Sequence, residues 1–248
     1  MRLIIEPDYD KLSTWVADYV IERIHKAAPT AEKPFVLGLP TGSSPIGMYR
    51  ELVKACKEGC ISFRHVITFN MDEYVGLATE HPESYHSFMH RHLFDHIDIL
   101  PQNIHILNGN APDLTAECDA YERAIEAAGG IDLFIGGIGP DGHIAFNEPG
   151  SPFTSETHIA DLTDQTISDN ARFFEGDKSQ VPTQAITQGL ASIMRAKKIL
   201  LIATGANKAD AVYGMIKGAK SEECPASILQ DHADVTVILD KDAASKIQ

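Results

Sequence analysis

Short runs of aliphatic and β-branched residues recur along this chain, and longer amphipathic stretches separate them. Runs that are apolar on both faces predict strands buried in a parallel sheet, and the amphipathic stretches predict helices packed on it. We expect strands at Arg2–Ile5, Phe35–Leu39, Val66–Asn70, Ile104–Leu107, Ile131–Ile135, Lys198–Ala203 and Val235–Leu239. We expect helices at Tyr9–Lys26, Pro45–Lys57, Ser84–Phe94, Thr115–Ala127, Gly189–Arg195 and Lys208–Lys217. The alternation predicts an α/β fold, with a mainly parallel sheet covered by helices on both faces.

Length and charge narrow the class of protein further. The 248 residues, 44% of them hydrophobic, are enough for the core of a single domain. A formal charge of −14 disfavours a nucleic-acid partner, because a phosphate backbone would be repelled. No run of apolar residues predicts a membrane span or a secretory signal. With only four cysteines, the composition favours a reduced, cytoplasmic protein.

The glycine-rich stretch 136–150 directly follows the predicted strand Ile131–Ile135 and holds Asp141, His143 and Glu148. Open α/β sheets bind ligands at the carboxyl ends of their strands, so this loop is a candidate for chemistry. His143 can exchange a proton near neutral pH, and either carboxylate can fix its tautomer or stabilise its charged form. The usual alternative for a single histidine is a structural role, which the flanking carboxylates make less favoured here.

A second loop, Pro40–Pro45, combines Gly42 with the hydroxyls of Thr41, Ser43 and Ser44 before a predicted helix. Free amides at a helix start, together with hydroxyls, suit a phosphate group. The nucleotide spacing G-x-x-x-x-G-K-[ST] is absent, so a small phosphorylated metabolite fits better than ATP or NAD. A helix start merely capped by Ser or Thr is the alternative.

Four further residues are candidates on weaker patterns. Lys208, in a predicted first helical turn, and Arg172, in an irregular segment, each suit a phosphate, but either could be a solvated surface charge. Asp72 and Glu73 follow the predicted strand Val66–Asn70, where a shielded carboxylate can act as a general base. The residues alone do not choose between these two carboxylates, and capping of the next segment is the alternative.

Two other features bear on function. The segment from about residue 150 to 182 is the least regular part of the chain, and we expect it to form a lid or a substrate-facing loop. Between His81 and His96 the pairs His86/His90 and His92/His96 have the i, i+4 spacing that can hold a cation on a helix. No third ligand has an obvious spacing, so we expect no functional metal.

Several segments together resemble the glucosamine-6-phosphate deaminases over nearly the whole chain. These segments are Leu37–Gly42, Thr68–Leu77, His81–Tyr85, Leu107–Pro112 and Asp141–Pro149, of which the second and the last are highly specific to that family. The resemblance implies a Rossmann-like α/β fold. It also implies conversion of a phosphosugar, glucosamine 6-phosphate, and water into fructose 6-phosphate and ammonia, without an organic cofactor or a catalytic metal.

Carried over by residue, the resemblance assigns roles. Asp72 matches the base that moves a proton from C2 to C1 of the open-chain sugar, and Glu73 becomes supporting. His143 matches the residue that opens the pyranose ring, with Asp141 and Glu148 as its partners. The family's anion-binding positions correspond to Gly42, Ser43, Ser44, Arg172 and Lys208, and Thr41 is supporting.

The chain also departs from the family pattern. Regulated members carry basic residues for an allosteric phosphosugar where this sequence has His158 and Ala160, and they have a longer tail. We therefore expect no activation by N-acetylglucosamine 6-phosphate, and either a monomer or a homo-oligomer smaller than a hexamer. Two rival functions share the fold. A 6-phosphogluconolactonase needs no base at position 72, and a sugar-sensing transcriptional regulator carries a basic segment ahead of the domain, where this acidic chain has a predicted strand.

Overall fold

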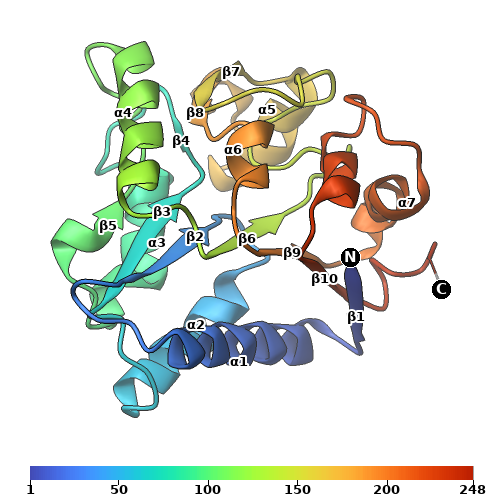
Figure 1. Ribbon diagram of the computed structural model, residues 1–248. Coiled ribbons are helices and arrows are strands. Elements are labelled where there is room, and N and C mark those ends of the chain that lie inside the picture. Colours follow the sequence, from blue (N-terminus) through green and yellow to red (C-terminus); the bar gives the residue numbers. More distant parts are fainter. Residues whose placement is uncertain (248) are drawn as a thin grey trace.

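The fold is built on one parallel sheet (Figure 1). The computed structural model of the protein describes residues 1–247. In spatial order the seven strands of the sheet are β1 (Arg2–Glu6), β10 (Val235–Asp240), β9 (Ile199–Ala203), β6 (Leu133–Gly137), β2 (Phe35–Leu39), β3 (Val66–Asn70) and β5 (Ile104–His105). All the strand pairs in this sheet are parallel. The predicted α/β class and parallel sheet are confirmed.

Helices cover both faces of the sheet, as the alternation predicted. They are α1 (Tyr9–Ala27), α2 (Ile46–Lys57), α3 (Tyr85–His92), α4 (Leu114–Ala127), α5 (Asp164–Asn170), α6 (Leu190–Met194) and α7 (Ala209–Lys217). Short 3-10 helices are η1 (Phe94–His96), η2 (Pro101–Asn103), η3 (Ala171–Phe173), η4 (Lys178–Gln180), η5 (Ala206–Lys208) and η6 (Pro225–Asp231). In Figure 1, α1 and α2 lie on one face, and α4, α6 and α7 lie on the other. No helix within residues 1–247 is long and apolar enough to cross a bilayer.

Each face of the sheet has its own hydrophobic core, because successive strand residues point in opposite directions. On β9, Leu200 packs with the residues of α1 and α2, whereas Leu201 packs with those of α4, α6 and α7. On β6, Leu133 and Phe134 divide between the same two cores. The strands are therefore apolar at consecutive positions, which is the pattern that identified them in the sequence.

A second, smaller sheet was not predicted. It is antiparallel, in the order β4 (Asp72–Tyr74), β8 (Gln184–Thr187) and β7 (His158–Asp161). Asp72, which we expected in a loop, begins β4 and pairs with Thr187. The segment 150–182 was expected to be irregular, but it contains β7, α5, η3 and η4. These elements pack on a third apolar cluster that includes Tyr74, Phe146 and Phe174.

A pair of leucine substitutions tests the importance of the sheet's central strands. Leu201→Ala removes a fully buried side chain from β9 and should lower the free energy of unfolding by about 2–5 kcal/mol. Leu3→Ala on edge strand β1, where the side chain is 42% exposed, is the matched control and should cost less than about 1 kcal/mol. Urea unfolding followed by circular dichroism measures both. Equal losses would contradict this assignment of the core.

Candidate active site

One cavity of about 920 Å³ opens at the carboxyl ends of β2, β3, β6 and β9. The loops that follow these four strands line it, and residues 165–174 contribute another part of its wall. The chain leaves β2 toward β3 on one side and leaves β6 toward β9 on the other, so the winding of the sheet reverses between β2 and β6. Ligands bind at such a reversal in open parallel sheets.

The structure brings most of the sequence-predicted residues into this cavity. The lining includes Thr41, Gly42, Ser43, Ser44, Asp72, His143, Arg172 and Lys208. Asp141 and Glu148 do not line the cavity but contact His143, and Glu73 lies on β4 directly after Asp72. Residues from loops more than 160 positions apart in the sequence therefore face one space.

Two glycines allow the loop after β6 to hold His143 close to the backbone. A Cβ atom at Gly139 would lie 2.2 Å from a ring carbon of His143, so the imidazole occupies the space that any side chain there would need. Gly142 has φ +91, and a Cβ there would lie 2.7 Å from the Cys224 sulfur. Both glycines thus serve close packing, Gly139 against the His143 ring and Gly142 against Cys224.

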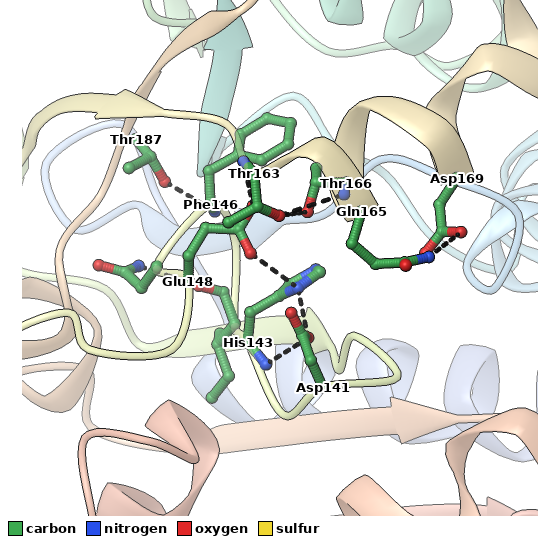
Figure 2. A network of polar contacts seen from close by, with 11 residues as sticks. Asp141, His143, Phe146, Glu148, Thr163, Gln165, Thr166, Asp169 and Thr187 are labelled. Carbon is green, nitrogen blue, oxygen red and sulfur yellow. Dashed lines mark hydrogen bonds and ion pairs between the residues drawn. The ribbon is translucent and has the colours of Figure 1, made fainter. Parts of the chain in front are cut away.

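The imidazole of His143 lies between two carboxylates, as Figure 2 shows. Its Nδ1 atom is 2.7 Å from Oδ1 of Asp141 and 3.8 Å from Oε2 of Glu148. The Asp141 carboxylate also accepts the backbone N–H of His143 at 3.2 Å. Burial alone would raise the pKa of Asp141, but its contacts with His143 outweigh burial and lower that pKa to about 2. Asp141 is therefore ionised at neutral pH and favours a proton on Nδ1.

Asp72 is a buried carboxylate at the cavity wall, with 5% of its surface exposed. Its Oδ1 atom has no hydrogen-bond partner within residues 1–247. Burial, and then the neighbouring charge of Glu73, raise the pKa of Asp72 well above its ordinary value. A carboxylate with a raised pKa is a stronger base than an exposed one, which suits proton abstraction near neutral pH.

The loop after β2 presents free donors at the start of α2. The amides of Gly42, Ser43 and Ser44 donate to no other group in the described residues, and no side chain caps the helix. The alternative of a Ser- or Thr-capped helix start is therefore wrong. Outside the cavity, the Tyr9 hydroxyl of α1 donates to the Ser43 carbonyl at 3.0 Å and accepts the Gly47 N–H at 2.8 Å. This fixes the loop with its donors free.

Two cations lie close to each other at the same cavity. Burial lowers the pKa of Lys208, and the charge of Arg172 lowers it further. Neither side chain forms an ion pair with a carboxylate in the part of the chain that the structure describes. Lys208 is half-buried beside a second cation, and the charges of Asp141 and Asp169 offset this only in part, so an anion would suit this end of the cavity. Arg172 is exposed, and a solvated charge stays the alternative for it.

Sequence reasoning missed the residues that join the parts of the site. Thr187 of β8 accepts the Phe146 N–H at 3.2 Å, and Asn147 donates to the Gln188 carbonyl at 2.8 Å. Thr163 donates to Glu148 through its hydroxyl at 3.3 Å. Through β8, the strand of Asp72 and the loop of His143 become one unit. The short, half-polar run Gln184–Thr187 carried no recognisable strand signal.

Metal ligation has one geometric candidate among residues 1–247. Asp141, His143 and Glu148 bring three ligand atoms within 4.8 Å of one another. Both carboxylates lie beside the same ring nitrogen, Nδ1, at 2.7 and 3.8 Å, and this arrangement also suits the exchange of a proton between them and the histidine. In the His81–His96 segment, the rings of His86 and His90 approach to 4.6 Å, while His92 packs on Phe88 and His96 bonds the Arg91 carbonyl.

Comparison with known proteins gives consistent matches along the whole chain. The family model described as glucosamine-6-phosphate isomerases/6-phosphogluconolactonase matches residues 7–238. A Porphyromonas gingivalis protein named glucosamine-6-phosphate deaminase is 74% identical, covering 100% of this chain and 94% of that protein. The Parabacteroides distasonis protein of the same name is 54% identical, with 100% and 92% covered.

Two solved structures extend the comparison. A structure described as a monomeric glucosamine-6-phosphate deaminase is 42% identical and superposes with a TM-score of 0.95, covering 99% of this chain and 100% of the other. The 6-phosphogluconolactonase from Trypanosoma cruzi superposes with a TM-score of 0.78 at 23% identity, over 100% of this chain and 97% of that one. The second likeness is one of fold alone.

The burial of Asp72 predicts that this residue destabilises the folded protein at neutral pH. Its pKa is raised on folding, so the folded state loses stability as pH rises above the unfolded value of about 3.9. Asp72→Asn removes this titration and should raise Tm at pH 7 by roughly 2–4 °C for each kcal/mol recovered, with a smaller gain near pH 4. Calorimetry at both pH values measures the difference. A variant less stable than the native chain at pH 7 would contradict the prediction.

Proposed function

Because this chain belongs to the family of glucosamine-6-phosphate isomerases and 6-phosphogluconolactonases, we propose that it is a deaminase that converts glucosamine 6-phosphate and water into fructose 6-phosphate and ammonia. One observation carries the proposal. A buried base, Asp72, and a histidine relay, His143, share a cavity with the donors and cations of an anion site. An aldose-to-ketose rearrangement of a phosphosugar needs these three parts together.

Ring opening is the proposed task of His143. The imidazole takes the proton of the C1 hydroxyl and delivers a proton to the ring oxygen, so the C1–O5 bond breaks and an aldehyde forms at C1. Asp141 and Glu148 stabilise the imidazolium that exists between these two transfers. The ionised state of Asp141, with its pKa of about 2, supports this role.

Isomerisation and loss of the amine follow at Asp72. The carboxylate removes the C2 proton while the protonated amine of the substrate gives a proton to O1, so a neutral enolamine forms; the resulting carboxylic acid then returns its proton to C1. C2 is then an imine carbon. Water adds to that carbon and ammonia leaves, which gives the C2 ketone of fructose 6-phosphate. One residue serves as base and acid, so its raised pKa suits both steps.

The phosphate is proposed to bind at the other end of the cavity, on the amides and hydroxyls of Gly42, Ser43 and Ser44, with Thr41 beside them. Arg172 and Lys208 supply the positive charge. Binding energy at this non-reacting end orients C1 and C2 over Asp72. We treat residues 1–248 as one domain, in which the segment 150–182 acts as the lid because its residues 165–174 line the cavity.

We also infer how the protein assembles, how it is regulated and where it is located. All residues of the proposed site come from one chain, and the 42% identical relative is described as monomeric, so we infer a monomer. We expect a hyperbolic substrate curve that N-acetylglucosamine 6-phosphate leaves unchanged. Light scattering and saturation kinetics measure these properties, and a sigmoidal curve made hyperbolic by that ligand would contradict the inference. A phosphosugar substrate and four free cysteines support a cytoplasmic location.

Product analysis tests the activity directly. Native protein incubated with glucosamine 6-phosphate should release ammonia and fructose 6-phosphate in equal amounts, and Asp72→Asn should lower kcat at least about 100-fold. His143→Gln should lower it less when an open-chain sugar analogue replaces the cyclic substrate. Hydrolysis of 6-phosphogluconolactone without ammonia release would favour the lactonase. Full activity of Asp72→Asn would exclude Asp72 as the base.

The anion site can be tested separately from the chemistry. Lys208→Ala should raise KM for glucosamine 6-phosphate by roughly 10- to 100-fold, because a charge-assisted bond to phosphate contributes about 1.5–3 kcal/mol. Lys217→Ala, at the other end of α7, removes an exposed lysine that does not line the cavity and is the matched control. Steady-state kinetics give both values. An unchanged KM in Lys208→Ala would exclude this lysine from phosphate binding.

A further inference from the structure

Asp72 and Glu73 are neighbouring carboxylates on β4 that face different surroundings. Consecutive strand residues point to opposite sides, so Asp72 lines the cavity while Glu73 points toward the start of α3. Each is only 5% exposed. Two ionisable carboxylates buried side by side cost stability, and their retention needs a physical reason.

The carboxylate of Glu73 is held by backbone amides. Its Oε1 atom accepts the N–H groups of Tyr74 at 2.8 Å and Tyr85 at 3.0 Å, and its Oε2 atom accepts that of His86 at 2.9 Å. Tyr85 and His86 are the first two residues of α3, where the helix dipole also favours a negative charge. Burial raises the pKa of Glu73, and these three amides oppose the effect of burial.

We propose that Glu73 is a positioning residue, whose amide-bound carboxylate ties the strand of Asp72 to α3 and places a fixed negative charge beside the proton that Asp72 exchanges. The inference rests on the proposed deaminase activity. It assigns to Glu73 two separable effects, one on the placement of Asp72 and one on its electrostatics.

The surroundings of Asp72 make Glu73 the dominant charge. The titratable groups that face it are Tyr49 of α2, Tyr74 of β4, Tyr85 of α3, Tyr121 of α4 and His143 across the cavity. Burial raises the pKa of all four phenols, so they stay neutral at the pH of catalysis. Arg172 and Lys208 line the same cavity, where we place the phosphate. Besides burial, the charge of Glu73 is what raises the pKa of Asp72.

The test is the pH profile of kcat/KM for ammonia release by the full chain. Glu73→Gln removes the charge but keeps an amide oxygen that can accept the Tyr74 and Tyr85 N–H groups. Asp72 should then ionise more readily. The acidic limb of the profile, in which kcat/KM falls because Asp72 becomes protonated, should therefore move to lower pH by roughly 1–2 units. As a weaker base, Asp72 should also give a kcat several-fold lower at an unchanged KM.

Two variants separate this role from a structural one. Glu73→Asp keeps the charge but shortens the reach to α3, so the acidic limb should stay within about 0.5 unit while kcat falls at least tenfold. Asp98→Asn is the matched control, because Asp98 also accepts a backbone N–H, from Phe63 at 2.6 Å, and does not line the cavity. It should lower Tm without moving the acidic limb.

The outcomes that overturn the inference are distinct from a failure of the proposed function. A native chain that releases no ammonia would reject the deaminase itself. An active native chain with an unmoved acidic limb in Glu73→Gln, or an equal movement in Asp98→Asn, would reject the role of Glu73. If Glu73→Gln does not fold, Glu73→Asp decides alone: full kcat, or a limb moved by more than one unit, would overturn the proposal.

Discussion

Parallel pairing of β2, β3, β6 and β9 is the constraint on which the site depends. Strands that run in the same direction end at the same edge, so the segments that follow them meet even though they are distant in the sequence. Each strand is apolar on both faces, and the two helical layers hold the sheet from either side. The loops that emerge at this edge are therefore free to carry polar groups without weakening either core.

The small antiparallel sheet converts these neighbouring loops into one rigid site. Strand β8 pairs with the strand of Asp72 and, through Thr187, accepts an amide of the loop that carries His143. The buried carboxylates of the site are stabilised by backbone amides and hydroxyls, in addition to the ion-pair contact with His143. Glu73 accepts three amides, and Glu148 accepts the Thr163 hydroxyl. Such partners hold charge in place, while Asp72, the proposed base, keeps an oxygen without a hydrogen-bond partner among the described residues.

The main sheet could be predicted strand by strand from the sequence. Strands that are buried on both faces appear there as short apolar runs, such as Phe35–Leu39 and Ile199–Ala203, and helical stretches separate these runs. The second sheet was missed because β4 is the three-residue run Asp72–Tyr74 and β7 and β8 mix polar and apolar residues. Such strands exist through their pairing, which sequence periodicity does not record. In the site, glycine and charge patterns located the loops of His143 and Ser43. The choice of Asp72 over Glu73 required the family resemblance, since only tertiary structure shows that one side chain faces the cavity and the other faces α3.

The contact between Tyr9 and the loop after β2 has a consequence for the affinity of the proposed phosphate site. Its hydroxyl bridges Ser43 and Gly47, and so joins the first helix of the chain to a loop that begins more than thirty residues later. The conformational entropy of that loop is therefore lost when the protein folds and not when an anion arrives. A preorganised loop of this kind makes the proposed anion binding less costly, and it also makes the affinity of the cavity sensitive to the docking of α1, a helix that contributes no residue to the cavity lining.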